Sequence, residues 1–174
     1  MTMQSTLHSL PSERLLALDA RLTAIKSRRV ATERLRAYRP YAKQREYHAA
    51  REREVLFMAG NQLGKTLAGA AEAAIHLTGE YPDWWDGHRF ERPVTMLAGS
   101  ESYELTRDGV QRLLIGPPAN EEDWGTGMIP ARALIDRTRR AGVSNALDGV
   151  TIRHVSGGVS SLLFKAYEQG RGKW

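Results

Sequence analysis

The sequence has 174 residues, of which 25 are Lys or Arg, 20 are Asp or Glu and none is Cys. This length is sufficient for one domain with a buried core, and an apolar fraction of 41% excludes wholesale disorder. The lack of Cys excludes disulfides, thiolate metal sites and Cys nucleophiles, and no stretch predicts a membrane-spanning helix or a secretory signal.

The net charge of +5 is concentrated in the N-terminal third. Residues 1–53 contain 12 Lys or Arg against 5 Asp or Glu, whereas residues 54–174 contain 13 against 15. A basic arm of this kind suits nucleic acid or an acidic protein surface. A solvated helix with surplus Arg is the alternative interpretation.

The first predicted element is a long helix over residues 11–37. Pro11 is favourable in a first helical turn, and neither Pro nor Gly follows before Tyr38. One face of this helix carries four apolar residues: Leu15, Leu18, Leu22 and Ile25. We expect this stripe to dock on the body of the protein, because two heptads are too few to predict a coiled coil. Residues 1–38 are therefore interpreted as a basic helical arm and residues 39–174 as the main domain.

The main domain is predicted to alternate helices and strands. Helices are expected over residues 41–51, 65–77, 102–115 and 130–140, strands over 54–58, 94–98, 150–155 and 160–164, and loops over 79–93 and 116–127. The last two strands flank Gly157-Gly158 at hairpin spacing. This order favours an α/β layer fold.

A phosphate-binding loop, with Ala at the first Gly position, is predicted between the strand over 54–58 and the following helix. Its residues are Ala59, Gly60, Asn61, Gln62, Leu63, Gly64, Lys65 and Thr66. The two glycines would let successive N–H groups converge on phosphate oxygens, and the helix dipole would favour the anion. Lys65 would contact the β- and γ-phosphates of ATP, and Thr66 would ligate Mg²⁺. A Gly-rich turn without a ligand is the alternative.

An adenine-binding pair is predicted on the helix before this loop. Tyr41 and Gln44 are three residues apart and share a helix face. A Gln amide can both donate to and accept from the edge of adenine, and an aromatic ring can stack on its face. The pair would select ATP over GTP. The alternative is that both are ordinary surface residues.

The run over residues 41–85, YAKQREYHAAREREVLFMAGNQLGKTLAGAAEAAIHLTGEYPDWW, resembles the N-terminal ATPase domain of tailed-phage large terminase subunits, which package DNA into procapsids. The polar pair Asn61-Gln62 in the loop, the Tyr41–Gln44 pair before it and the final run SLLFKAYEQGRGKW carry the resemblance. That last run is similar to the segment leading into the family's Walker B strand. The resemblance implies a P-loop NTPase-type three-layer sandwich with a mostly parallel sheet.

The resemblance also implies the function of the complete protein, which is ATP hydrolysis coupled to DNA translocation, with ATP and Mg²⁺ as cofactors. The implied partners are double-stranded DNA, a portal protein, a small terminase subunit and further copies of the chain, in the cytoplasm of the bacterial host and not in a membrane. Arg171 stands where family members have an arginine finger, a catalytic group that would act on a neighbouring subunit's nucleotide. A surface Arg in a Gly-flanked tail is the alternative.

Two features depart from the family pattern. Many large terminases have Arg in the loop's polar pair, where this chain has Asn61-Gln62. The sequence also ends at Trp174, before a strand ending in Asp-Glu and before the nuclease domain. We therefore interpret it as a fragment truncated before Walker B that binds ATP with little turnover. Residues 133–136 (ALID) are the nearest Walker B substitute, but Arg137 and a predicted helix weigh against them.

Two further functions are kept as alternatives. One is a non-catalytic adapter whose basic helix binds a partner, and the other is a different P-loop ATPase such as a helicase. Of the remaining candidates, the five His residues show no metal-ligand spacing, and Trp84-Trp85 is expected to plug a loop against the body rather than to stack on bases.

Overall fold

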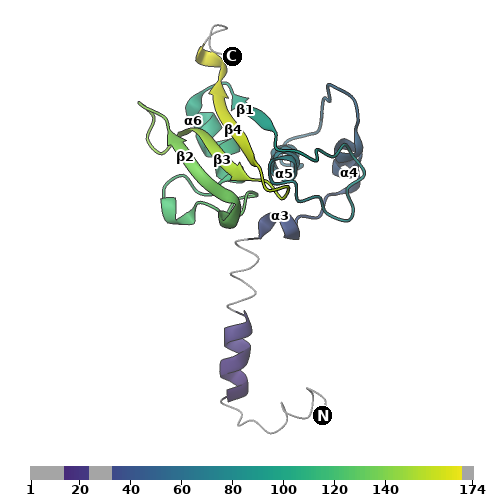
Figure 1. Cartoon of the computed structure of the whole chain (residues 1–174), viewed down its shortest axis with the longest axis vertical. Helices are drawn as coiled ribbons and strands as arrows, with labels where there is room; N and C mark the ends of the chain where they lie inside the picture. The colour runs from purple at the N-terminus through teal and green to yellow at the C-terminus, as the bar shows by residue number, and fades with distance from the viewer. Residues whose placement is uncertain (1–13, 24–32, 170–174) are drawn as a thin grey trace.

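The computed structural model describes residues 14–23 and 33–169 (Figure 1). The helices are α3 (Arg34–Ala37), α4 (Ala42–Ala49), α5 (Lys65–Thr78), α6 (Tyr103–Leu105) and α7 (Arg112–Leu114), and a π-helical segment η1 (Thr106–Gln111) joins the last two. The strands are β1 (Thr95–Ser100), β2 (Leu134–Arg139), β3 (Leu147–Arg153) and β4 (Val159–Ala166). Short 3₁₀ turns occupy Glu121–Asp123, Ala131–Ala133 and Tyr167–Gln169. None of the described helices combines the length and the apolar character needed to cross a bilayer.

The described part of the N-terminal arm is only partly as predicted. Residues 14–23 are helical, and α3 follows after residues 24–32, which lie outside the described residues together with 1–13. Glu33, the residue before α3, has φ −124° and ψ 39° and is not helical, so the expectation of one continuous helix over 11–37 is wrong at this residue. Leu15, Leu18 and Leu22 are exposed, so the expected docking of this stripe on the body is wrong for these residues, and Ile25 is not described.

The four strands form one mixed sheet in the order β1-β4-β3-β2. Strands β1 and β4 are parallel, whereas β4 pairs with β3, and β3 with β2, in antiparallel fashion. The predicted hairpin around Gly157-Gly158 is confirmed, because the turn returns β4 directly alongside β3. An α/β fold is thus confirmed, but the expectation of a mostly parallel sheet is wrong for the described strands.

Helix α5 and the η1 segment pack on one face of this sheet. Helix α5 contacts β1, β3 and β4, and the η1 segment contacts β1 and β4. Along β4 the burial alternates, with Leu162 and Phe164 in the core and Leu163 exposed on the other face. The Ala-rich surface of α5 allows close approach to the sheet, so Ile75 and its neighbours are fully buried. The described residues therefore form two layers, and the three-layer P-loop arrangement stays a prediction.

Two predicted elements are wrong. Residues 54–58 form no strand, and Leu56 is 82% exposed, since none of the described strands pairs with this run. Residues 134–139 form strand β2 instead of part of a helix over 130–140. The β-branched Ile135 and Thr138 favour a strand there, and β3 supplies the hydrogen-bonding partner. Asp136 is exposed on β2, away from α5 (Figure 1), so the structure gives no support to a Walker B role for it.

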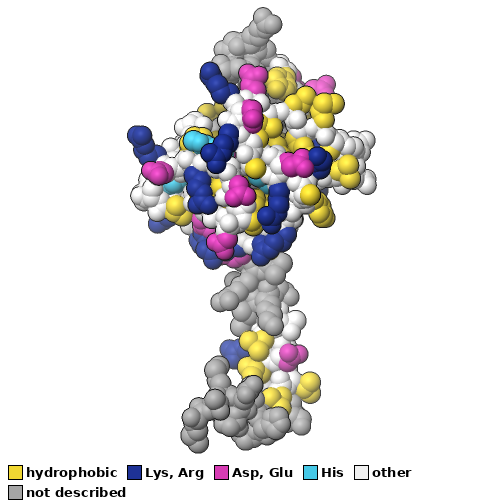
Figure 2. All heavy atoms as spheres, turned by 90° about the vertical axis from the view of Figure 1, so that its right-hand side faces the viewer, with side chains coloured by type: hydrophobic (Ala, Val, Ile, Leu, Met, Phe, Trp, Pro, Cys, Tyr) yellow, Lys and Arg dark blue, Asp and Glu magenta, His cyan; other side chains and the backbone are white. Residues whose placement is uncertain are grey.

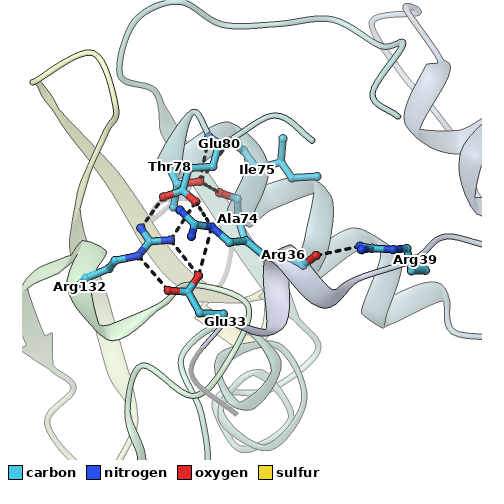
Figure 3. Close-up of polar contacts among 8 residues, drawn as sticks. All are labelled: Glu33, Arg36, Arg39, Ala74, Ile75, Thr78, Glu80 and Arg132. Atoms are coloured by element: carbon cyan, nitrogen blue, oxygen red, sulfur yellow. Dashed lines mark hydrogen bonds and ion pairs between the residues drawn. The ribbon is translucent and has the colours of Figure 1, made fainter. Parts of the chain in front are cut away.

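A charged cluster joins α3 to the end of α5 (Figure 3). Arg132 donates to Glu80 Oε1 at 2.5 Å and to Glu33 Oε2 at 3.2 Å, and Arg36 Nε lies 3.2 Å from Glu33. Hydrogen bonds to Glu80 and Glu33 raise the pKa of the Arg132 guanidinium. Because these side chains are partly exposed, each pair contributes about 1 kcal/mol or less. The cluster fixes the point at which the chain enters the body, where Leu35 is buried.

The side of the molecule that bears α4 has mixed charge. Figure 2 shows Lys and Arg side chains interspersed there with Asp, Glu and exposed hydrophobic side chains. On α4 itself, Lys43 Nζ pairs with Glu46 at 2.6 Å, and the Arg45 guanidinium lies 5.7 Å from the centre of the Trp84 ring. The surplus of basic residues does not form one uniform positive patch on this side, and the DNA interaction expected for the arm stays a prediction.

Candidate nucleotide-binding site

The predicted phosphate-binding loop is a turn that leads directly into α5. Its backbone has positive φ at Gln62 (61°) and at Gly64 (75°). The positive φ of Gly64 favours glycine, and a Cβ there would lie 2.7 Å from Gln44 Nε2 and displace that side chain. At Gly60 a Cβ would meet only the Leu63 side chain at 3.4 Å, which is ordinary contact. This conformation of the loop therefore favours glycine at 64 but not at 60.

The Lys65 ammonium lies against the inner side of this turn. Its Nζ donates to the carbonyl oxygens of Ala59 at 2.5 Å and Gly60 at 2.7 Å. In the described part of the chain no side chain caps the N-terminus of α5, so its first N–H groups remain available to an anion. Phe57, Met58, Ala59 and Lys65 line an open pocket of about 510 Å³ beside them. A phosphate could replace the two carbonyl oxygens as the partner of this ammonium.

Gln44 connects α4 to the loop. Its side chain is 2% exposed; Oε1 accepts from Tyr41 N at 2.9 Å, and Nε2 donates to Gly64 O at 3.2 Å. The same carbonyl accepts from Ala68 N of α5 at 2.9 Å. The Tyr41 side chain is 75% exposed at the N-cap of α4. The structure thus brings the predicted adenine pair and the predicted phosphate loop together, while their contacts with a nucleotide stay predictions.

The remaining predicted residues divide into two groups. Asn61, Gln62, Leu63 and Thr66 are exposed around the turn, where a ligand could reach them. Arg171 lies outside the described residues, so its proximity to a nucleotide stays a prediction.

A partly buried polar network behind the loop was missed by the sequence analysis. Glu72, on α5, accepts hydrogen bonds from His48 Nδ1 of α4 and from His76 Nε2, the latter at 3.2 Å. The Tyr38 hydroxyl lies 3.0 Å from His48 Nε2, and the Tyr81 hydroxyl lies 2.9 Å from His76 Nδ1. The i,i+4 spacing of Glu72 and His76 was the one local signal. The other members come from separate segments, so the sequence places no two of them together.

The donor directions in this network follow from its carboxylate. An ionised Glu72 can only accept, so each imidazole donates from the nitrogen that faces it, and its other nitrogen lies within hydrogen-bond distance of a tyrosine hydroxyl. Tyr81 Oη accepts in turn from Phe90 N at 2.7 Å. Burial alone would raise the pKa of Glu72, but the hydrogen bonds from His48 and His76 outweigh it and lower that pKa. Each of these side chains therefore has a polar partner, and the partly buried negative charge of Glu72 is hydrogen-bonded on two sides.

Aromatic side chains enclose this network. The Trp85 ring centre lies 5.5 Å from His48 and 5.3 Å from His76, and Trp85 itself is 3% exposed. Its Nε1 donates to His88 O at 3.0 Å. The expected plug by Trp84-Trp85 is confirmed, because the pair closes the loop over 79–93 against α4 and α5.

Acid is expected to destabilise the protein through Glu72. The pKa of Glu72 is lower in the folded state than in the unfolded state, so ionisation of this carboxyl stabilises the fold. This stabilisation is complete above pH 4.5, the ordinary pKa, and is lost as the pH falls through the lower folded-state pKa. Urea unfolding followed by circular dichroism between about pH 6 and 3 should show a steeper loss in the wild type than in Glu72→Gln. Glu91→Gln, at an exposed loop position, should keep the wild-type slope. Equal slopes in all three proteins would contradict this role of Glu72.

Comparison with known proteins places the chain in a family. Residues 56–174 match the family described as "Terminase large subunit, T4likevirus-type, N-terminal", and this match covers more than half of the chain. The chain belongs to the terminase large subunit family. A relative described as "Terminase, large subunit", from Salmonella phage P22, is 38% identical to this terminase chain over 164 residues.

The matches cover different parts of the chain and of the candidate site. The match to the P22 relative covers 82% of this terminase chain and 32% of the relative, so the chain spans about a third of the relative's length. No solved structure matches. The family match at 56–174 includes the whole loop over 59–66, α5 and the four strands, whereas Tyr41 and Gln44 precede it.

Proposed function

We propose that this chain is the ATP-binding part of a large-terminase motor that couples ATP hydrolysis, in the complete protein, to the movement of DNA into procapsids. One observation carries the proposal: the Lys65 ammonium lies on the inner side of the 59–64 turn, at the uncapped N-terminus of α5. That is where a phosphate group would meet both a positive charge and free backbone N–H groups. Membership of the terminase large subunit family supports the motor role.

Each group at the site has a proposed role. The N–H groups of the turn and of the first turn of α5 would hold the phosphates, and Lys65 would contact the β- and γ-phosphates. The exposed hydroxyl of Thr66 suits a hard cation, so Thr66 would ligate Mg²⁺, which neutralises phosphate charge when bound. Tyr41 and Gln44 would bind adenine, and Arg171 would act as an arginine finger.

The proposed partners follow from the family. They are double-stranded DNA, a portal protein, a small terminase subunit and further copies of the large subunit, in the cytoplasm of the bacterial host. The basic residues of the N-terminal arm are one place where DNA phosphates could bind, since they outnumber acidic residues there by seven.

Titration with a fluorescent ATP analogue, with and without Mg²⁺, tests the nucleotide site. We expect saturable binding by the wild type that Mg²⁺ strengthens. Thr66→Ala should keep binding without the metal and lose the gain that Mg²⁺ gives, because the ligand to the cation has been removed. Thr95→Ala, an exposed change on β1, is the control and should behave as the wild type. A complete lack of saturable binding, or an undiminished Mg²⁺ effect in Thr66→Ala, would overturn the proposal.

A further inference from the structure

Helix α4 is held on the body by two polar side chains. Of its eight residues, only Gln44 and His48 are buried, and they lie one turn apart on the same face. Gln44 reaches the loop at Gly64 O, and His48 reaches Glu72 on α5. An eight-residue helix is too short to be stable in isolation. The placement of α4 beside the loop therefore depends strongly on these two contacts.

The His48 end of this attachment is fixed on every side. Its second nitrogen meets the Tyr38 hydroxyl at 3.0 Å, and the rings of Trp84 and Trp85 lie 5.4 and 5.5 Å away, centre to centre. Across the contact, Glu72 is also held by His76 of its own helix. Outside α5, α4 makes two further ring contacts among the described residues: Tyr47 stacks on Phe57 at 4.9 Å between ring centres, and the Arg45 guanidinium lies 5.7 Å from the centre of the Trp84 ring. Among these contacts, the His48–Glu72 contact is thus the one that fixes α4 to the helix carrying Lys65.

The placement of α4 would affect a bound nucleotide through the position of the Gln44 amide. The Gln44 amide already makes two contacts at its 2% exposed position, so a small shift of α4 would remove it from Gly64 O and from any base held there. The groups proposed to hold phosphate are different, because Lys65, Thr66 and the N–H groups of the turn belong to the loop and to α5. Base recognition and phosphate binding thus depend on separate attachments.

We propose that His48 and Glu72 are positioning residues that set the base preference of the nucleotide site by holding Gln44 in register with the loop. This proposal rests on the proposed binding of ATP at residues 59–66. The His48–Glu72 contact, which lies behind the loop, would thereby help the site to discriminate between ATP and GTP. Neither residue is expected to touch the nucleotide.

Competition binding with ATP, GTP and inorganic tripolyphosphate tests the proposal. We expect the wild type to prefer ATP to GTP by about 10-fold or more, because a mismatched purine edge leaves a buried amide unpaired. His48→Phe keeps an aromatic ring but cannot donate to Glu72. It should bring the ATP-to-GTP affinity ratio close to 1, while tripolyphosphate affinity changes by less than about 2-fold. His48→Asn, which can still donate to the carboxylate, should retain most of the preference.

Two further variants are included so that the result with His48→Phe can be interpreted. The double variant His48→Phe with Glu72→Gln removes the partly buried charge together with its donor, so the comparison stands even if the loss of His48 alone unfolds the single variant. Lys43→Ala, on the exposed face of α4, is the control and should keep the wild-type ratio.

The possible results separate this proposal from the proposed function. An unchanged ATP-to-GTP ratio in His48→Phe or in the double variant, or an equal loss of all three ligands, would overturn the positioning role. A wild type that binds ATP and GTP equally would also overturn it and leave the phosphate loop standing. A wild type that binds none of the three ligands would overturn the ATP proposal itself, and the positioning role with it.

Discussion

Lys65→Ala is expected to weaken ATP binding by at least about 100-fold, because the ammonium would make charge-assisted hydrogen bonds to two phosphates and each such bond contributes about 1.5–3 kcal/mol. In the structure the same Nζ donates to Ala59 O and Gly60 O, so the side chain already lies where the phosphates would bind. Calorimetric titration of the wild type and the variant with ATP measures the change.

Lys165→Ala is the matched control for this experiment. Lys165 lies on β4 with its side chain on the sheet face opposite α5, so its loss should leave ATP affinity within about 2-fold of the wild type. Circular dichroism and thermal melting of both variants establish that the fold is retained. Unchanged ATP affinity in a folded Lys65→Ala would mean that residues 59–66 do not bind phosphate.

Phe164→Ala is expected to cost about 3–5 kcal/mol of unfolding free energy, which for a chain of this size corresponds to a fall in Tm of roughly 6–20 °C. Phe164 is 1% exposed in the core between the sheet and α5, and its removal leaves a cavity there. Thermal unfolding followed by circular dichroism measures the effect.

The neighbouring residue provides a sharp control for this change. Leu163 follows the same strand but points to the other face of the sheet and is 38% exposed. Leu163→Ala should therefore cost less than about 1.5 kcal/mol. Equal losses at 163 and 164 would contradict a sheet covered by helices on one face.

Sequence reasoning succeeded where the signal was local. The Ala-rich run after Lys65 identifies α5, and the Gly157-Gly158 turn identifies the β3–β4 hairpin, because helix periodicity and turn chemistry reside in contiguous residues. The turn over 59–64 is local in the same sense: it leads into α5 as predicted, but residues 54–58 before it form no strand.

The errors have a common physical origin in partners that lie far along the chain. Residues 54–58 have strand composition, but none of the described strands pairs with them. Residues 134–139 were interpreted as helical, whereas pairing with β3 makes them a strand. The network around Glu72 was invisible for the same reason, since His48 is 24 residues away in another helix. Local propensity cannot report such contacts.

Amide hydrogen exchange with and without Mg²⁺ and ATP tests the central claim most directly, because it locates the nucleotide on the chain. The N–H groups that are proposed to hold the phosphates belong to residues 60–66, so their exchange should slow on addition of ATP, with smaller slowing in α4 around Gln44. Exchange in β2, which lies away from α5 (Figure 1), should not change. Saturable ATP binding that leaves exchange at 60–66 unchanged and slows it elsewhere would contradict the assignment of this loop as the phosphate site.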